Sequence, residues 1–231
     1  MSLRPLPPPR RLGDLARTLL RHLTRLLTCL VYRLDVEGVQ HVPSKGPALL
    51  VANHLSYADA FVVACRLRRN PRFVMSHAML DMPGLGWLFR LARVIPIAPA
   101  KENAAVKAEA FARIDAALAA GELVILFPEG RCTRDGRMDV FRPGMERVLA
   151  KRAAAGAPVP VIPIGLHGLF GSVFSFAHGA PMTTRPRRFR ARVRVRFGAP
   201  LSPRVSAAEA REAVARLVAR ARFAPAARSL A

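Results

Sequence analysis

The chain has 231 residues, and 52% of them are hydrophobic, so it can bury a large core within one domain and is not a disordered polypeptide. Lysine and arginine number 37 against 15 aspartates and glutamates, which gives a net charge of +22. A chain that is both this basic and this apolar is expected to act at an anionic surface with an oily side, and a membrane fits that description better than a nucleic acid does.

The three cysteines, Cys29, Cys65 and Cys132, lie far apart and lack the spacing of a metal site or a disulfide framework. The histidines are not clustered either, so we expect no metal ion and no bound cofactor. The N-terminal segment lacks the uninterrupted apolar core of a signal peptide, and no uncharged stretch reaches the roughly 20 residues that span a bilayer.

Residues 1–11 are rich in proline and arginine and are predicted to be disordered. From residue 12 to residue 34, leucines recur every three to four positions, which predicts an amphipathic helix. Its polar side carries Arg17, Arg21, Arg25 and Thr28. We expect the leucines to enter the acyl boundary of a membrane while the guanidinium groups meet lipid phosphates. The alternative is a helix that packs its leucines on the core.

Short apolar runs separated by turn residues begin at residue 35 and are typical of buried strands. They lie at 35–39, 48–52, 72–75, 123–127 and 160–164. Helical stretches lie between and after them, at 57–68, 85–92, 104–120, 145–154 and 207–223. This alternation predicts that residues 35–231 form a single α/β domain, in which a central, largely parallel mixed sheet is flanked by helices.

Arginines alternate with apolar residues from 188 to 197, so that one face of this segment carries only cations. One interpretation is a solvated edge strand whose charges discourage pairing with another sheet. The other is a surface that binds anionic lipid or, less simply, an acidic carrier protein.

A polar turn that contains His54 and Asp59 follows the predicted strand at 48–52. The segment from Ser56 to Asp59 has the S-x-x-D form of a capping box, which would place Asp59 in the first turn of a helix and His54 just before it. A carboxylate in that position can reach back to the imidazole and make it a general base, suited to removing a proton from an alcohol. The alternative is an ordinary capping aspartate beside an incidental histidine.

A second polar turn follows the predicted strand at 123–127 and contains Glu129, Gly130, Arg131 and Arg134. The carboxyl ends of such strands are where open sheets bind ligands. A glycine there allows close approach of a backbone, and arginine is suited to bidentate contact with a phosphate.

Together, residues 53–59 (NHLSYAD) and 127–130 (FPEG) resemble the glycerophospholipid acyltransferase family, the PlsC-like lysophosphatidic acid acyltransferases. Two further segments match the family in the same order, one from 86–90 through 95–97 and the other at 159–165. The resemblance covers roughly residues 35–198.

The resemblance implies transfer of a fatty acyl group from a thioester, acyl-CoA or acyl-carrier protein, to a glycerol hydroxyl, without a covalent acyl-enzyme. It implies that His54 is the general base and that Asp59 orients it. Glu129, Gly130 and Arg131 would form the acceptor-binding turn, and Arg131 or Arg134 would neutralise the phosphate of the acceptor. The expected acceptor is 1-acyl-sn-glycerol 3-phosphate and the product phosphatidic acid, made by a peripheral or monotopic protein on the cytoplasmic face of the cell membrane.

The chain departs from the family in two places. Many members read FPEGTRS in the third block, whereas residues 127–133 read FPEGRCT, so the arginine comes one place early. The second block often ends with an arginine, but Pro99 occupies that place here, and Arg90, Arg93 or Lys101 is expected to compensate. The FPEGR form looks more like acyltransferase segments fused to transporters, some of which handle lysophosphatidylethanolamine, so another lysophospholipid is the alternative acceptor.

Two further classes of function compete with this interpretation. A serine hydrolase is the nearest enzymatic rival, because Ser56, His54 and Asp59 all occur, but the chain contains no G-x-S-x-G sequence. The rival from another class is a non-catalytic basic module that binds membranes or nucleic acid. For the acyltransferase we expect a lysophospholipid, an acyl donor and an anionic membrane surface as partners, and no nucleic acid.

Overall fold

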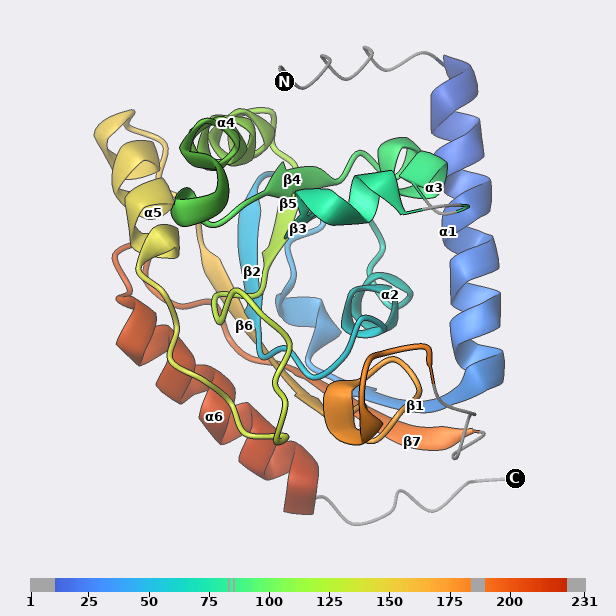
Figure 1. The fold of residues 1–231 in the computed structure, drawn as a ribbon. Helices are drawn as coiled ribbons and strands as arrows, with labels where there is room; N and C mark the ends of the chain where they lie inside the picture. The colour runs from blue at the N-terminus through green and yellow to red at the C-terminus, as the bar shows by residue number, and fades with distance from the viewer. Residues whose placement is uncertain (1–10, 83, 85, 184–189, 224–231) are drawn as a thin grey trace.

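A seven-stranded sheet forms the centre of the protein in the computed structural model, which describes residues 11–82, 84, 86–183 and 190–223 (Figure 1). The strands lie in the order β1-β7-β6-β2-β5-β3-β4, and every neighbouring pair is parallel except β6 and β7. The predicted largely parallel mixed sheet is therefore confirmed. Their bounds are β1 Tyr32–Glu37, β2 Ala48–Ala52, β3 Arg72–Ser76, β4 Ile95–Ile97, β5 Leu123–Leu126, β6 Val161–His167 and β7 Ala191–Phe197.

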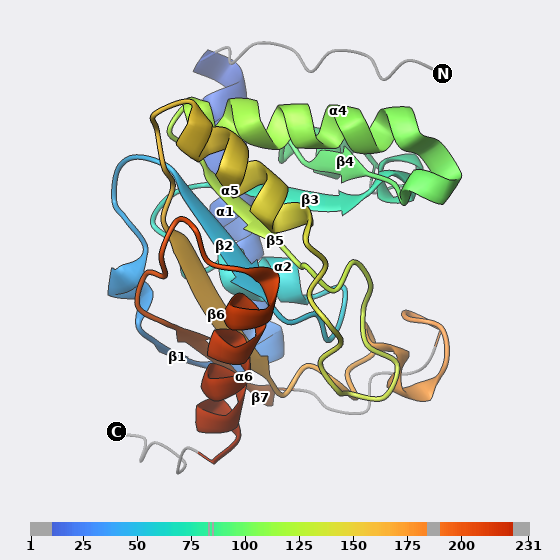
Figure 2. The ribbon, with the colours of Figure 1, turned by 90° about the vertical axis from the view of Figure 1, so that its left-hand side faces the viewer.

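Helices cover both faces of the sheet. Figure 2 shows α4, α5 and α6 lying across one face, while α2 packs on the other face and α1 runs outside α2 and α3 (Figure 1). The helices are α1 Arg11–Val31, α2 Asp59–Ala64, α3 Gly86–Leu91, α4 Ala100–Ala119, α5 Gly144–Ala154 and α6 Ala207–Phe223. Short 3-10 helices occur at Val39–His41, His77–Asp81 and Phe176–His178. No helix within these described residues is long and apolar enough to cross a membrane.

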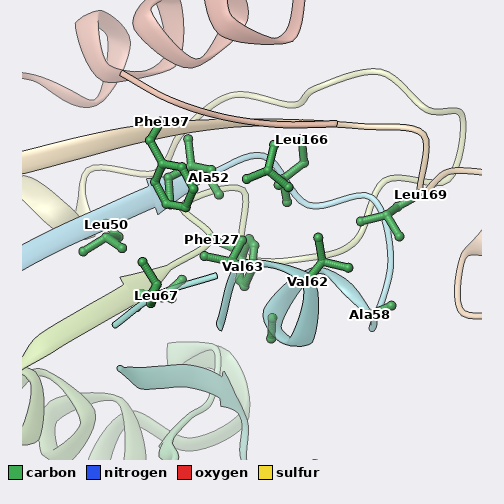
Figure 3. Close-up of a cluster of buried hydrophobic side chains, with 14 of the residues drawn as sticks. Leu50, Ala52, Ala58, Val62, Val63, Leu67, Phe127, Leu166, Leu169 and Phe197 are labelled. Carbon is green, nitrogen blue, oxygen red and sulfur yellow. The ribbon is translucent and has the colours of Figure 1, made fainter. Parts of the chain in front are cut away.

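The centre of the sheet is apolar on both faces because helices cover both. All five residues of β2 are completely buried. Leu50 and Ala52 join a cluster with Val62 and Val63 of α2, which Figure 3 shows, whereas Leu49 and Val51 pack toward α4, α5 and α6. A continuous apolar run is what a parallel strand buried on both faces requires. The two strands that precede the polar turns, β2 and β5, are neighbours in this core.

The N-terminal helix ends at Val31, three residues before its predicted end. Tyr32, Arg33 and Leu34 instead belong to β1, which pairs with β7, and Tyr32 is buried. The leucine spacing could not show this boundary, because Leu34 fits both a helical period and a strand. The predicted disordered tail at residues 1–11 lies outside the described residues, except for Arg11, which begins α1.

The arginine-rich strand is not an edge strand, so the edge-strand interpretation is wrong. β7 lies between β1 and β6, and the register sets Asp35 opposite Arg194 and Glu37 opposite Arg196. Arg196 is only 2% exposed, and its Nη2 lies 3.0 Å from Asp35 Oδ2 and 3.3 Å from Glu37 Oε1. The arginine hydrogen bonds hold the pKa of Asp35 below its ordinary value. Two of the alternating arginines, Arg194 and Arg196, thus neutralise the acids of β1. The first two residues of the alternating segment, 188 and 189, lie outside the described residues.

Asp35→Ala should lower the free energy of unfolding by about 2–3 kcal/mol, because it leaves the buried Arg196 with one carboxylate fewer. The loss is smaller than the roughly 3–5 kcal/mol typical of a fully broken buried pair, since Glu37 stays in contact. Urea denaturation measures it. The matched control is Arg192→Ala on the exposed end of the same strand, expected to change stability by no more than about 0.5 kcal/mol. Equal losses in both variants would contradict the assignment.

Candidate active site

The two polar turns meet at the carboxyl edge of the sheet. β2 and β5 are parallel, with Val51 opposite Leu126, so the residues that follow each strand emerge side by side. The side-chain amide of Asn53, directly after β2, donates to the Leu166 carbonyl at 3.1 Å and accepts from the Leu166 amide at 2.8 Å. The Asn53 side chain thereby continues the contact between β2 and β6 beyond the last strand residue, Ala52, and fixes the point at which the chain leaves the sheet.

His54 and Asp59 are in direct contact, as their spacing suggested. His54 Nδ1 lies 2.8 Å from Asp59 Oδ2, and the Asp59 side chain is completely buried. The same oxygen accepts the backbone N–H groups of Leu55 at 2.6 Å and Ser56 at 3.0 Å. Because this carboxylate collects donors from the turn itself, it holds the backbone that carries His54 as well as the imidazole.

The capping box forms only in part. α2 begins at Asp59 with Ala58 as its N-cap, and residues 57 and 58 form a turn. Ser56 Oγ accepts from the Ala58 amide at 3.2 Å and donates to Asp59 Oδ1 at 2.9 Å. The predicted helix at 57–68 is therefore shorter at both ends, and the Asp59 carboxylate serves the turn in front of the helix.

The His54 ring is held on three sides. It stacks on Phe127 with ring centroids 4.2 Å apart, Asp59 holds Nδ1, and Nε2 lies 3.1 Å from Cys132 Sγ. The side chain keeps 19% of its surface exposed. Sequence reasoning passed over Cys132, because it considered the cysteines only for their mutual spacing. The available signal was the place of Cys132 inside the turn that carries Glu129.

Glu129 ties the two turns together. Its side chain is buried, Oε1 accepts the His54 amide at 2.7 Å and Oε2 accepts the Asp139 amide at 2.7 Å. Burial raises the pKa of Glu129, and the two amide hydrogen bonds partly oppose that rise. The Thr133 amide donates to the His54 carbonyl at 2.9 Å, which adds a second link. Both Glu129 oxygens thus accept backbone amides, and one of these amides is that of His54.

The remaining residues of the second turn lie at the surface beside His54. Gly130 has φ +71°, and a Cβ there would come within 3.0 Å of Arg142 Nε, so the glycine accommodates a neighbouring side chain. Arg131 is exposed and binds Asp139 at 2.7 Å. Arg134 is exposed and lies over the Phe176 ring, 5.3 Å from its centroid. Arg131 and Arg134 flank Cys132 and Thr133, which contact His54 as Glu129 does.

Three other cations were expected to compensate for the missing arginine of the second block, and within the described residues none of them forms a hydrogen bond or an ion pair with His54 or with the second polar turn. Arg93 precedes β4 and binds Glu122, directly before β5, at 2.8 Å, which places it at the amino edge of the sheet. Arg90 lies 3.9 Å from Asp81. Lys101 is exposed at the start of α4, which follows the carboxyl end of β4.

An apolar pocket lies between α1, α2, α3 and β3. Its walls include Leu20, Phe61, Ala64, Phe73, Leu88 and Phe89. Ala60, the residue after Asp59, also lines it, so the pocket reaches the helix that begins at the buried carboxylate. Among the described residues no group of three or more histidines, cysteines or acidic residues is placed to hold a metal ion.

The chain is similar to known proteins in sequence and in fold. A family model described as Acyltransferase matches residues 33–167. The chain is 29% identical over 149 residues to a chloroplastic 1-acyl-sn-glycerol-3-phosphate acyltransferase of Arabidopsis thaliana, covering 64% of this chain and 41% of that protein. It is 29% identical over 168 residues to a lyso-ornithine lipid O-acyltransferase of Rhizobium meliloti, covering 72% and 54%.

The fold is similar to the crystal structure of the 1-acyl-sn-glycerophosphate acyltransferase PlsC from Thermotoga maritima. The TM-score is 0.71 at 20% identity, over 94% of this chain and 86% of that one. The chain spans about half the length, or less, of the curated relatives it matches. The matched residues 33–167 include both polar turns and the strands β2 and β5 that carry them, and the chain belongs to the Acyltransferase family.

Proposed function

We propose that this protein is an O-acyltransferase that moves a fatty acyl group from acyl-CoA or acyl-carrier protein to the free hydroxyl of 1-acyl-sn-glycerol 3-phosphate, giving phosphatidic acid. The observation that carries the proposal is the contact between His54 and the buried Asp59, which lies at the carboxyl edge of the sheet and within the residues that match the family model. Relatives named for this reaction in Arabidopsis thaliana and Pseudomonas aeruginosa support the choice of acceptor.

The geometry suits general-base catalysis. Asp59 accepts a hydrogen bond from the N–H at Nδ1, so the proton of the neutral imidazole stays on Nδ1 and the lone pair lies on Nε2. Nε2 would take the proton of the acceptor hydroxyl as its oxygen forms a bond to the thioester carbonyl carbon. When the carbon–sulfur bond breaks, the leaving thiolate would take that proton from the imidazolium. Asp59 stabilises the imidazolium in between and keeps its position because the turn amides hold it.

Arg131 and Arg134 are the cations we propose for the acceptor phosphate. Both are exposed and lie in the turn whose Cys132 and Thr133 contact His54. The exposed ion pair of Arg131 with Asp139 contributes little stability, so a phosphate could replace Asp139 at small cost. A different lysophospholipid is the second candidate acceptor, and the similarity to a lysophosphatidylcholine acyltransferase of Danio rerio, 29% identical over 110 residues, favours it.

We further propose that α1 lies at the membrane interface. Five of its leucines point away from the domain and are at least half exposed, namely Leu19, Leu23, Leu26, Leu27 and Leu30. The opposite side of the helix faces the protein, where Thr28 is buried and Arg21 donates to the Arg68 carbonyl at 2.8 Å. An apolar stripe of this kind supports insertion into lipid, and it argues against a helix that packs its leucines on the core.

The apolar pocket behind α1 is where we propose the acyl chain lies. Leu20 and Thr24 of α1 form one wall, so the pocket sits between the proposed membrane helix and α2. In this arrangement a lipid-derived chain would pass from the membrane side toward the helix that begins at Asp59. The arrangement suits a peripheral or monotopic protein, and we propose the cytoplasmic face of the cell membrane as its location.

His54→Ala should lower acceptor-dependent thiol release from palmitoyl-CoA by about 10²–10⁴-fold, because the general base is lost. The assay uses purified protein with lysophosphatidic acid, lysophosphatidylethanolamine or no acceptor. The exposed His178→Ala variant is the matched control and should keep full activity. Full activity of the His54 variant would overturn the mechanism. Release with lysophosphatidylethanolamine alone would change the acceptor, and release without any acceptor would favour a hydrolase.

Arg131→Gln and Arg134→Gln are expected to raise the KM for lysophosphatidic acid by about 10–100-fold, since each removes a charge-assisted contact to phosphate. Arg93→Gln should leave that KM unchanged, because Arg93 lies at the opposite edge of the sheet. Steady-state kinetics with a fixed donor concentration measures the difference. A rise in KM for Arg93→Gln alone would move the phosphate site away from His54.

Leu26→Glu should weaken binding to vesicles of phosphatidylglycerol and phosphatidylethanolamine at least about tenfold, because a leucine leaves the lipid and a charge replaces it. Val140→Glu is the matched control, since Val140 is 68% exposed against 66% for Leu26, and the charge change is the same. Sedimentation with vesicles measures both. Equal weakening of the two variants would show that net charge, and not the α1 leucines, governs binding.

A further inference from the structure

Two exposed arginines lie side by side at the start of the β1–β7 ladder. The register sets Arg33 of β1 opposite Arg192 of β7, and both side chains are exposed. Because side chains alternate along a strand, two residues that lie opposite each other point to the same face of the sheet. Within the described residues neither guanidinium forms a hydrogen bond or an ion pair, although Arg192 acts weakly on Asp35 at longer range. We refer to Arg33 and Arg192 as the arginine pair.

The arginine pair breaks the charge pattern of its own ladder. The next two positions on the same face join opposite charges, Asp35 with Arg194 and Glu37 with Arg196. Like charges at facing positions of adjacent strands repel, so the arginine pair is unfavourable in the isolated protein. An anion that contacts both guanidinium groups from outside removes this repulsion. The first position of the ladder therefore points to an external ligand of negative charge.

The arginine pair lies at the edge of the sheet that carries His54. β2 and β6 are parallel, β6 and β7 are antiparallel, and β1 is parallel to β7, so β1 and β7 begin where β2 and β6 end. Gly168, directly after β6, lies so close to β7 that a Cβ there would be 2.3 Å from the Arg192 carbonyl oxygen. The loop after β6 also reaches the turn that carries His54, because the Phe174 carbonyl accepts the Tyr57 amide at 3.0 Å.

The arginine pair also lies beside the end of α1. Arg33 is two residues beyond Val31, the last residue of α1, and the Arg190 amide donates to the Val31 carbonyl at 2.9 Å. Figure 1 shows β1 and β7 beginning below the end of α1. Leu30, the last of the five outward leucines of α1, is 54% exposed. Apolar and cationic groups are thus adjacent at this corner of the protein.

We propose that the arginine pair binds the headgroups of anionic phospholipids and forms a second membrane contact next to α1. The inference rests on the proposed membrane contact of α1 and adds a preference for anionic lipid. A bilayer offers acyl chains to the leucines and phosphate oxygens, at the level of the headgroups, to arginines that extend on long stems. A folded acidic protein or a nucleic acid offers negative charge but no apolar layer for the leucines beside it.

Contact at two places fixes how the protein is oriented on the membrane. Contact through α1 alone leaves the domain free to rotate about the helix axis. The arginine pair shares an edge of the sheet with His54, so its contact with headgroups turns that edge toward the lipid. The phosphate of a lysophospholipid that stays in the leaflet lies at the level of the same headgroups. The proposed base and its acceptor are thereby brought to the same depth.

The test is binding of the full chain to two kinds of vesicle, made of phosphatidylcholine alone or of phosphatidylcholine mixed with phosphatidylglycerol. The double variant Arg33→Gln/Arg192→Gln should bind the anionic vesicles about 30-fold more weakly at low salt, which is about fivefold for each arginine. Its binding to the neutral vesicles should not change. High salt should reduce the difference from the wild type, because ions screen the attraction. Sedimentation over a range of lipid concentrations measures the binding.

The matched control is the double variant Arg204→Gln/Arg216→Gln, which removes the same charge elsewhere. Arg204 follows Leu201, which pairs with the start of β6 at the opposite edge of the sheet, and Arg216 lies on α6. Both control arginines are exposed. The control should bind both kinds of vesicle as the wild type does. Thermal melting checks the fold, and the variant of the arginine pair should melt no lower than the wild type because a repulsion is removed.

The outcomes separate the arginine pair from α1. A loss confined to the anionic vesicles supports the proposal. Equal loss on both kinds of vesicle, or a loss no larger than that of the control, overturns it and leaves the contact of α1 in place. If the wild type binds neither kind of vesicle, the proposed membrane contact of α1 fails together with the inference. If the variant keeps its vesicle binding but loses activity with an acyl-carrier-protein donor, the arginine pair binds the donor protein and the lipid proposal is overturned.

Discussion

The Asp59 carboxylate is completely buried, and four hydrogen bonds hold it there, from the His54 ring, the amides of Leu55 and Ser56, and the Ser56 hydroxyl. A buried carboxylate without such donors would be strongly destabilising, so the turn between β2 and α2 has to wrap around it. The direction of the His54 ring follows from that wrapping. Its Nδ1 must face Asp59, and Nε2 is then directed at Cys132 in the turn after β5.

Glu129 extends the same principle to a second strand. Both of its oxygens accept backbone amides, one from His54 and one from Asp139. The FPEG turn therefore fixes the position of the His54 backbone. The stacking of His54 on Phe127 comes from the same turn. Glu129 and Phe127 thus hold the proposed base, His54, in one position. Supporting contacts of this kind keep a preorganised site in its geometry.

Two segments that the sequence pattern singled out, the arginine-rich β7 and the leucine-rich α1, have different roles in the structure. In β7, Arg194 and Arg196 lie against the acids of β1, where they stabilise the sheet. Along α1, the inner side contacts the domain through Arg21, Thr28 and the pocket-lining Leu20, while the leucines of the outer side have their surface in solvent. Exposing this apolar stripe to water is unfavourable in free energy, because apolar surface stays hydrated. Contact with lipid would remove that surface from water and would explain why the leucines face outward.

The sequence by itself determined the α/β class, the two buried strands before the polar turns, the pairing of His54 with Asp59, and the family. The strands follow from local patterns, because a buried apolar run keeps its meaning in most surroundings. The pairing of His54 with Asp59 and the family follow from the two motifs taken together and in their order along the chain. Tertiary structure alone decided the rest. β7 pairs with β1, and Arg93 lies at the amino edge of the sheet. Glu129 accepts the backbone amide of His54, and Cys132 contacts the His54 ring although the two residues are 78 positions apart in the chain. Such contacts depend on which strands are neighbours and in what register, and periodicity in one segment carries no information about the segment that will lie beside it.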